Sequence, residues 1–348
     1  MREIVIVIAD LFLAPLAAAA APQPTPAFAD IPGIQSAGRF GTRGALERGW
    51  REWLARTLER ADLADVAPAC IAGATLDALW PSAPAGGSCW IATPVHLSAG
   101  LTRVHLNHAG LLQLSAEELA TLAFEFARTL GADGTTLTPL ACGDLLLCTP
   151  AIASLTTAEP ARCAGGVVTE VLPPGPAAAA LRRLMAEIEI WLHGQALNVA
   201  RTRRGALPVT ALWPWGADGR IVRPPPRVRE GMPPAFGRDA WLEGLWHLEG
   251  RACRVLPAHL EEVLEAAPGP LVVLVTQVGG QLQDGAEESL AQSLARLDAC
   301  FVSPAMLALR RGQLSGVTLI LNDVHVRVGR ASRFRLWRRQ RAGLESFA

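Results

Sequence analysis

The residues best suited to holding a ligand gather in one segment near the middle of the chain. Arg201 and Arg204 follow an amphipathic stretch and are themselves followed by Trp213 and Trp215. A guanidinium group can hold a phosphate through two hydrogen bonds, and an indole face can stack on a ligand or on an arginine. We therefore predict an anion-binding site formed by Asn198, Arg201, Arg204, Trp213 and Trp215. In a second interpretation, Asn198 caps a helix and the two tryptophans fill a domain interface.

Other catalytic arrangements find little material in this sequence. The chain has no lysine and no tyrosine, which excludes a Schiff-base lysine, a P-loop lysine and a tyrosine nucleophile. It also lacks the G-x-S-x-G, H-E-x-x-H and G-x-G-x-x-G motifs. His96, His105 and His108 can form a facial metal site, but no carboxylate accompanies them. We therefore favour histidines that are satisfied by ordinary packing and hydrogen bonds.

Composition and charge describe a globular protein without a charged field of one sign. Half of the 348 residues are hydrophobic, and 32 basic residues balance 32 acidic ones, which excludes a disordered chain. The exception is an arginine-rich C-terminal stretch, which has no acid between Asp323 and Glu345. This stretch can bind nucleic acid or another anionic partner. A basic, solvated edge strand and tail also explains it, and the zero net charge of the chain favours this second explanation. Its arginines are Arg327, Arg330, Arg333, Arg335, Arg338, Arg339 and Arg341.

The cysteines and the N-terminus favour a cytoplasmic protein. Seven cysteines are scattered without a C-x-x-C pair, so we expect reduced, buried thiols; Cys142 and Cys148 can also meet across a hairpin. The apolar stretch 4–16 imitates a secretory signal, but Glu3 and Asp10 argue against one. No other stretch is long and apolar enough to span a bilayer, so we expect no membrane association.

Strand-like runs alternate with helical patterns, which predicts an α/β fold with a mostly parallel sheet covered on both faces. A small α+β unit, residues 86–176, interrupts a core made of residues 1–85 and 177–348. Ser115 and Glu118 read as a capping box that opens a helix in that unit. The expected strands are 4–8, 89–97, 101–106, 136–140, 144–148, 271–275 and 317–321; the expected helices are 43–61, 115–130, 177–194, 239–249, 258–266 and 286–298.

The segment 193–216 resembles a motif of archaeal-type cofactor-independent phosphoglycerate mutases, H-P-V-N-x-x-R-x-x-x-G-x-x-x-x-N-x-x-W-x-W-G. It is still more similar to the bacterial phosphoglycerate-mutase-like proteins known as RpfE-type regulatory proteins. Gln195-Ala196 replaces the usual His-Pro, and Thr210 replaces Asn. Weaker similarity lies in residues 92–97, 114–118 and 132–134. The matching residues of the motif are Asn198, Arg201, Gly205, Pro208, Leu212, Trp213, Trp215 and Gly216.

The resemblance implies an alkaline-phosphatase-like three-layer sandwich, and in the mutases a site with two divalent metals and a serine nucleophile. Asp10 matches the position of the first metal ligand, but Gln277 and Gln281 occupy the positions where the mutases carry Asp and His. A neutral amide binds a dication poorly. Ser36 and Thr42 lie near the expected nucleophile without a supporting motif.

We therefore expect a degenerate, non-catalytic protein with a regulatory or binding role and no cofactor. The alternatives are a phosphomutase or phosphatase that builds a reduced Mn or Zn site around Asp10, and a nucleic-acid-associated regulator that acts through the C-terminal arginines.

Overall fold

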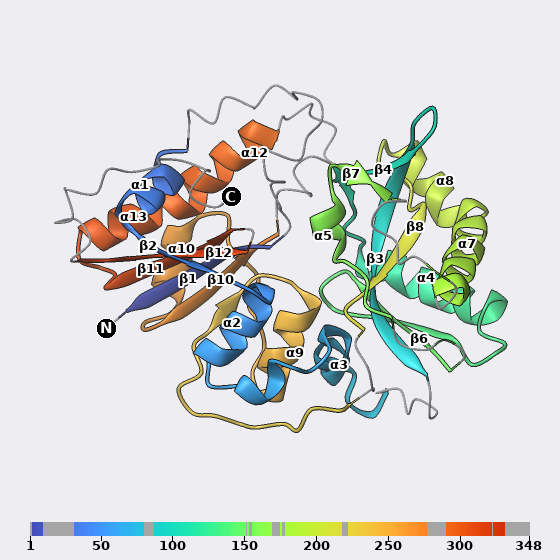
Figure 1. Ribbon diagram of the computed structural model, residues 1–348, viewed down its shortest axis with the longest axis horizontal. Helices are drawn as coiled ribbons and strands as arrows, with labels where there is room; N and C mark the ends of the chain where they lie inside the picture. Colours follow the sequence, from blue (N-terminus) through green and yellow to red (C-terminus); the bar gives the residue numbers. More distant parts are fainter. Residues whose placement is uncertain are drawn as a thin grey trace.

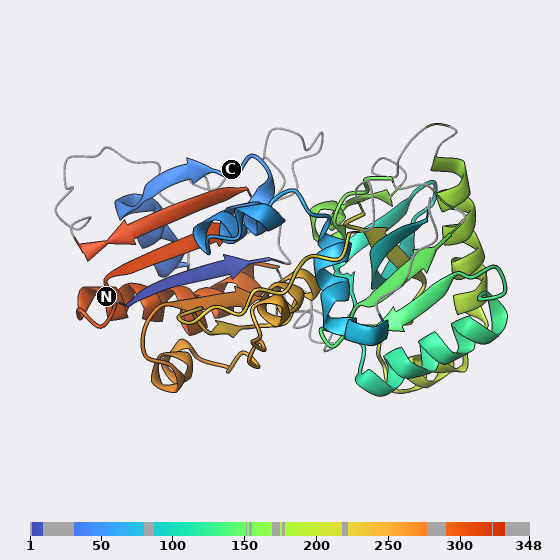
Figure 2. The same ribbon diagram turned by 90° about the horizontal axis from the view of Figure 1, so that it is seen from below.

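Two β-sheets stand side by side, each with its own helices (Figure 1, Figure 2). This arrangement is seen in a computed structural model of the chain. Each sheet contains strands from both halves of the sequence. The structure describes residues 2–9, 31–79, 87–150, 152, 155–168, 175, 178–217, 222–276, 290–321 and 323–330.

The first sheet is mostly parallel, as expected. Its order is β2-β12-β11-β1-β10-β9, and β1 pairs in parallel with both β10 and β11. Strand β12 runs antiparallel to both of its neighbours, β11 and β2. The central strands consist of unbroken aliphatic runs, which is typical of parallel strands buried on both faces. The strands are β1 (Glu3–Ile8), β2 (Thr42–Ala45), β9 (Ala235–Phe236), β10 (Leu271–Val275), β11 (Gly316–Leu321) and β12 (Val324–Gly329).

Helices cover both faces of this sheet and form its two cores. On one face Ile4, Ile6 and Val273 pack against α1 (Pro32–Phe40), α10 (Leu260–Ala266), α12 (Leu290–Leu297) and α13 (Ser303–Arg310). A π-helical turn, η5 (Asp298–Val302), joins the last two helices. On the other face Val7, Leu274 and Ile320 pack against α2 (Gly49–Thr57) and α9 (Ala240–Leu248), with the short η2 (Ala61–Leu63) alongside.

The second sheet is antiparallel and larger than expected. Its order is β5-β6-β3-β4-β7, and β8 pairs with β3. The sequence predicts that the segment after residue 176 belongs to the core, but helices and a strand within 178–215 belong to this second unit, because Ile188 and Leu212 pack in one hydrophobic core with Leu122 of helix α4 (Ala116–Thr129). Its strands and helices are β3 (Ser88–Ala99), β4 (Val104–Leu111), α4 (Ala116–Thr129), β5 (Thr136–Pro139), β6 (Leu145–Thr149), α5 (Pro160–Cys163), β7 (Gly166–Val167), α7 (Ala179–His193), α8 (Ala196–Arg203) and β8 (Ala211–Trp215).

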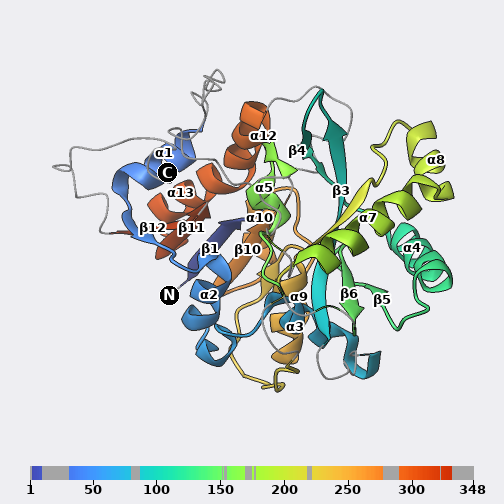
Figure 3. The ribbon, with the colours of Figure 1, turned by 45° about the vertical axis from the view of Figure 1, so that its right-hand side comes forward.

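Helices α3 (Pro68–Gly73) and α9 join the two units (Figure 1, Figure 3). Ile71 of α3 lies in the core of the first unit, whereas Ala69 and Ala72 pack against the second sheet. Gly244 of α9 sits directly on the α3 backbone, where an added Cβ would lie 2.0 Å from the Ile71 carbonyl oxygen. This glycine therefore permits the close helix packing. The chain continues from α3 into η3 (Ala74–Leu79).

Three local expectations were wrong. The helix predicted from residue 43 begins at Gly49, because residues 42–45 form β2 on β12. Strand β12 is not at the edge, since β2 covers it, and its His325 stacks on Trp53. Cys148 forms a disulfide with Cys89, not with Cys142, because these two residues lie opposite each other on paired strands β3 and β6. The thiols of this pair are therefore not reduced.

In the described part of the chain, no helix combines the length and apolarity that crossing a membrane requires.

Candidate functional site

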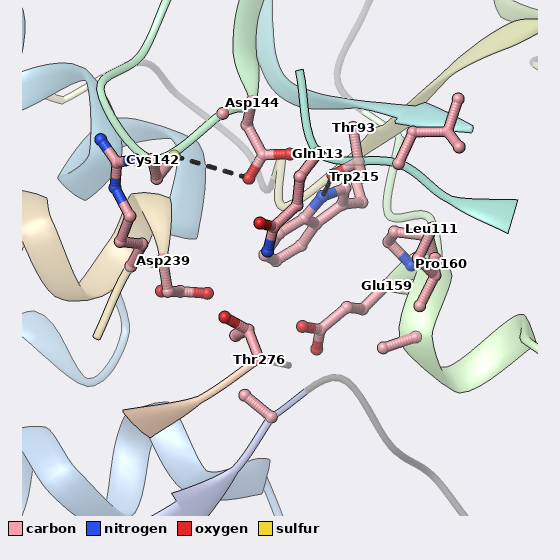
Figure 4. A pocket seen from close by; sticks show the side chains of 15 residues that line it. Thr93, Leu111, Gln113, Cys142, Asp144, Glu159, Pro160, Trp215, Asp239 and Thr276 are labelled. Atoms are coloured by element: carbon pink, nitrogen blue, oxygen red, sulfur yellow. Dashed lines mark hydrogen bonds between the residues drawn. The ribbon is translucent and has the colours of Figure 1, made fainter. Parts of the chain in front are cut away.

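A pocket lies between the two units, at the carboxyl ends of parallel strands (Figure 4). Ala9 follows β1, Thr276 follows β10, and Asp239 lies three residues after β9. Parallel strands direct their carboxyl ends to the same edge of a sheet, which is where open α/β proteins bind ligands. The second unit closes the pocket with Thr93, Gln113, Cys142, Asp144, Glu159 and Trp215. The cavity volume is about 100 Å³, enough for several waters or one small ligand.

Arg51 of α2 anchors the charged groups beside this pocket. Its guanidinium donates to both carboxylate oxygens of Glu159, each at 2.8 Å, and to Oδ2 of Asp239 at 2.9 Å. The side chains of Arg51, Glu159 and Asp239 are only 12, 12 and 10% exposed. The guanidinium also lies over the rings of Trp50 and Trp215, 4.4 and 4.7 Å from their centroids. One arginine thus ties helix α2 to both walls of the pocket.

Asp239 has a second structural task. Its Oδ1 accepts a hydrogen bond from the backbone N–H of Leu242 at 2.9 Å, so it caps the N-terminus of α9. Both oxygens of this carboxylate are therefore engaged within the protein. An aspartate directly before an apolar helical pattern is a recognisable cap signal, but only the fold brings it to Arg51.

Asp144 is a carboxyl group of the pocket whose pKa the fold shifts strongly. Burial and the negative charge of Asp239 raise the pKa of Asp144 to about 7, although hydrogen bonds from Thr93 and Cys142 and the charge of Arg51 act in the opposite direction. The Thr93 hydroxyl also accepts from the Trp215 indole N–H at 2.9 Å. Trp215, Thr93 and Asp144 thus form a chain of hydrogen bonds along the pocket wall.

A second carboxyl group nearby behaves alike. Burial raises the pKa of Glu243 to about 7, and the charges of Asp239 and Asp144 add to this effect, while Arg238 opposes it. Burial and neighbouring carboxylates, Asp144 foremost among them, also keep the pKa of the Cys142 thiol well above its ordinary value. The pocket thus combines negative charge with protonatable groups, and its thiol is protonated near neutral pH.

The arginines predicted to bind an anion lie elsewhere, on the far side of the second sheet. Arg201 is 4% exposed and donates to Oε1 of Glu118 at 2.8 Å and to the Leu207 carbonyl oxygen at 2.7 Å. Arg204 donates to the same carboxylate oxygen of Glu118. These guanidiniums hold α8 against α4 through the glutamate of the capping box, whose bonds with Ser115 are both present.

Asn198 likewise serves the backbone. Its amide donates to the carbonyl oxygens of Leu192 and Val209 at 2.8 Å and accepts from the Val209 N–H at 2.7 Å. Trp213 is 1% exposed and donates to the Ala158 carbonyl oxygen at 2.8 Å. Of the five predicted site residues, only Trp215 lines the inter-unit pocket.

Several residues that the sequence analysis singled out have no structural description. Asp10, Gln277, Gln281 and the C-terminal arginines from Arg333 to Arg341 lie outside the described residues. Within the described ranges, no group of three His, Cys, Asp or Glu side chains is arranged to hold a metal ion. His96 contacts the Pro208 carbonyl oxygen through Nδ1 at 2.9 Å.

Sequence reasoning missed Arg51, Asp144, Glu159 and Asp239. No motif surrounds Arg51 or Asp144, and the carboxylate partners of Arg51, Glu159 and Asp239, lie far away in the chain. The usable signal is positional, because Ala9 and Thr276 each follow a buried aliphatic strand of the first sheet. A search for polar groups near those strand ends would have pointed to this edge.

No protein family model and no curated protein matches the chain. Solved structures do match it. The cofactor-independent phosphoglycerate mutase of Thermoplasma acidophilum is 17% identical with a TM-score of 0.35, over 94% of this chain and 89% of the other. The PH0037 protein of Pyrococcus horikoshii is 11% identical with a TM-score of 0.45, over 94% of this chain and 87% of the other.

Proposed function

We propose that this chain is a degenerate phosphoglycerate-mutase-like protein of the RpfE type, on an alkaline-phosphatase-like fold, which binds a ligand and does not transfer phosphoryl groups. The inter-unit pocket is the binding site in this proposal. Binding there would change how the two units are held together, which suits a regulatory role. The motif in residues 193–216 supports the relationship, and the pocket supports the role.

The ion-pair network around Arg51 carries the proposal. A pair of catalytic metals needs several carboxylates and imidazoles whose oxygens and nitrogens are free to coordinate. Here both oxygens of Glu159 bind Arg51, and the oxygens of Asp239 bind Arg51 and the N-terminus of α9. The two carboxylates thus act as structural groups. The replacement of two expected metal ligands by Gln277 and Gln281 points the same way.

The charge of the pocket indicates which ligands it accepts. Asp144, Glu159 and Asp239 face one buried arginine, and Arg238 stands at the rim with its side chain 57% exposed. A phosphate dianion placed there would lose water, as the buried Asp144 carboxylate does, and would be repelled by the charge of Asp239; burial and this charge both raise the pKa of Asp144. A neutral or positively charged ligand with hydrogen-bond donors fits better. The anionic ligand predicted from Arg201 and Arg204 therefore does not suit this pocket.

Calorimetry with Mn²⁺ and Zn²⁺ tests the non-catalytic proposal. The wild-type protein and its Asp10→Ala variant should show the same absence of micromolar binding, with Asp133→Ala as the matched control on an exposed loop. Neither protein should interconvert phosphoglycerates. Micromolar binding that requires Asp10 would overturn the proposal and favour a metal-dependent phosphomutase or phosphatase.

Thermal unfolding tests the binding site separately. At pH 8, where Asp144 is ionised, ethanolamine should raise Tm more than inorganic phosphate does at equal ionic strength. Asp144→Asn should remove this difference, because it removes one of the charges that would attract the ammonium group. A larger shift with phosphate would contradict the assignment of the pocket to neutral or cationic ligands.

A further inference from the structure

A second hollow lies in the first unit, far from the inter-unit pocket. It is enclosed by α1, α13 and the end of β12, and its cavity volume is about 430 Å³. Gly329 of β12 pairs with Gly316, the first residue of the parallel strand β11. The hollow therefore lies at the amino ends of the parallel strands, and the inter-unit pocket lies at their carboxyl ends. Its volume falls within the roughly 300–1,000 Å³ typical of small-molecule sites.

The wall of this hollow is apolar. Phe40 of α1, Met306 and Leu309 of α13, and Val328 of β12 line it, and all four belong to or pack on the core of that face. Burying a ligand's hydrocarbon against such a wall is favourable in proportion to the apolar area removed from water. The wall thus offers a place for the carbon skeleton of a ligand.

The rim of the hollow is positively charged. Arg310, Arg311 and Arg330 line it, and all three are exposed. Arg310 donates to the Ser36 hydroxyl at 3.2 Å, and Arg330 donates to the carbonyl oxygens of Leu314, at 3.1 Å, and Gly312. Across the described ranges, none of these three guanidiniums forms a salt bridge with a carboxylate. The contacts with neutral oxygens hold Arg310 and Arg330 in place, and within the described residues no carboxylate neutralises the charge of the three arginines.

We propose that this hollow binds a small amphipathic organic anion, a carboxylate attached to a short aliphatic chain. The chain lies on the apolar wall, and the carboxylate receives charge-assisted hydrogen bonds from the arginines at the rim. Arg330 belongs to the C-terminal basic stretch, and Arg310 and Arg311 add charge from a separate part of the sequence. The other described arginine of that stretch, Arg327, is paired with Glu3 at 2.7 Å.

Calorimetry with octanoate tests this site, and Arg311→Glu is the central variant. Arg311 is the residue that follows the last turn of α13, and it is exposed, so we expect the substitution to leave the core intact. We expect octanoate to bind the wild type and to bind Arg311→Glu at least tenfold more weakly. Arg183→Glu, the same charge change at an exposed position of α7 in the second unit, should leave binding unchanged. Arg310→Gln removes one charge without reversal and should weaken binding less.

The probe itself supplies further controls. Hexanoate should bind several-fold more weakly than octanoate, because two methylenes leave the apolar wall. Octyltrimethylammonium, with the same chain and the opposite charge, should not bind. Absence of octanoate binding at millimolar concentration, or equal weakening by Arg183→Glu, would overturn the proposal. Binding of a single-stranded oligonucleotide that octanoate does not displace would instead favour a nucleic-acid surface.

Discussion

Arg51→Met is the most informative single change, because it removes the cation on which two walls of the inter-unit pocket depend. Methionine keeps much of the side-chain volume but leaves the buried carboxylates of Glu159 and Asp239 without a positively charged partner. Three hydrogen bonds and two contacts with tryptophan rings disappear together. Breaking a buried ion pair by removing one partner costs about 3–5 kcal/mol. With side chains 10–12% exposed, this network falls in that class.

Equilibrium urea unfolding measures this cost. We expect the free energy of unfolding of Arg51→Met to fall by about 3–5 kcal/mol. Arg51→Lys should fall between the wild type and Arg51→Met, because a lysine keeps the charge but cannot bind Glu159 through two parallel hydrogen bonds. Arg128→Met is the matched control: Arg128 pairs with Glu125 on the surface, with side chains 63 and 34% exposed. Its loss should cost no more than about 0.5 kcal/mol.

A compensating variant isolates the electrostatic cause. Adding Glu159→Gln and Asp239→Asn to Arg51→Met removes the unpaired charges, so part of the lost stability should return. If Arg51→Met costs less than about 1 kcal/mol, or if the three changes simply add, the reasoning from a buried charged network is refuted.

Three further predictions concern the rest of the fold. The disulfide between Cys89 and Cys148 closes a loop with a sequence separation of 59, so Cys89→Ser should lower the free energy of unfolding by about 4 kcal/mol, and alkylation of the unreduced, denatured wild type should label five cysteines, not seven. The pKa of Asp144 is raised from 3.8 to about 7, so between these pH values the folded state keeps a proton that the unfolded state has lost. The free energy of unfolding should therefore fall as pH rises through this range. Urea titrations at pH 5 and pH 8 should show a smaller difference for Asp144→Asn than for the wild type. Burial would raise the pKa of Glu118, but hydrogen bonds from the Ser115 N–H, Arg201 and Arg204 outweigh burial and lower that pKa. The free energy of unfolding should therefore fall as pH falls below 4.5. Glu118→Gln leaves Arg201 buried without its charged partner, so it should cost about 3 kcal/mol and abolish this acid dependence.

Local signals in the sequence predicted the elements well where one pattern dominated. The strand 271–275 has the predicted bounds, and the capping box at Ser115 and Glu118 opens α4. These successes share a cause, since a buried aliphatic run or a cap is satisfied largely by residues close in the chain. The helix predicted from residue 43 failed for the opposite reason. Residues 42–45 took their conformation from pairing with β12, which lies far away in the sequence.

The candidate site was harder to predict because its chemistry depends on distant partners. Arg201 looked like a free guanidinium in the sequence, and Glu118, 83 residues away, neutralises it. Arg51 carried no signal, yet Glu159 and Asp239 reach it from both units. A side chain's availability to a ligand is set by what the fold places beside it, so residue type and spacing alone could not rank these arginines.

The sequence by itself determined the mixed α/β architecture, the mostly parallel first sheet, and the absence of lysine and tyrosine chemistry. These properties follow from composition and from periodic burial, which act over a few residues. The tertiary structure alone decided that residues 178–215 complete the second sheet, that Cys89 pairs with Cys148, and which carboxylates surround the pocket. It also separated an acidic pocket at one edge of the first sheet from a basic hollow at the other, because electrostatic character at a site is the sum of charges that only folding brings within a few ångströms.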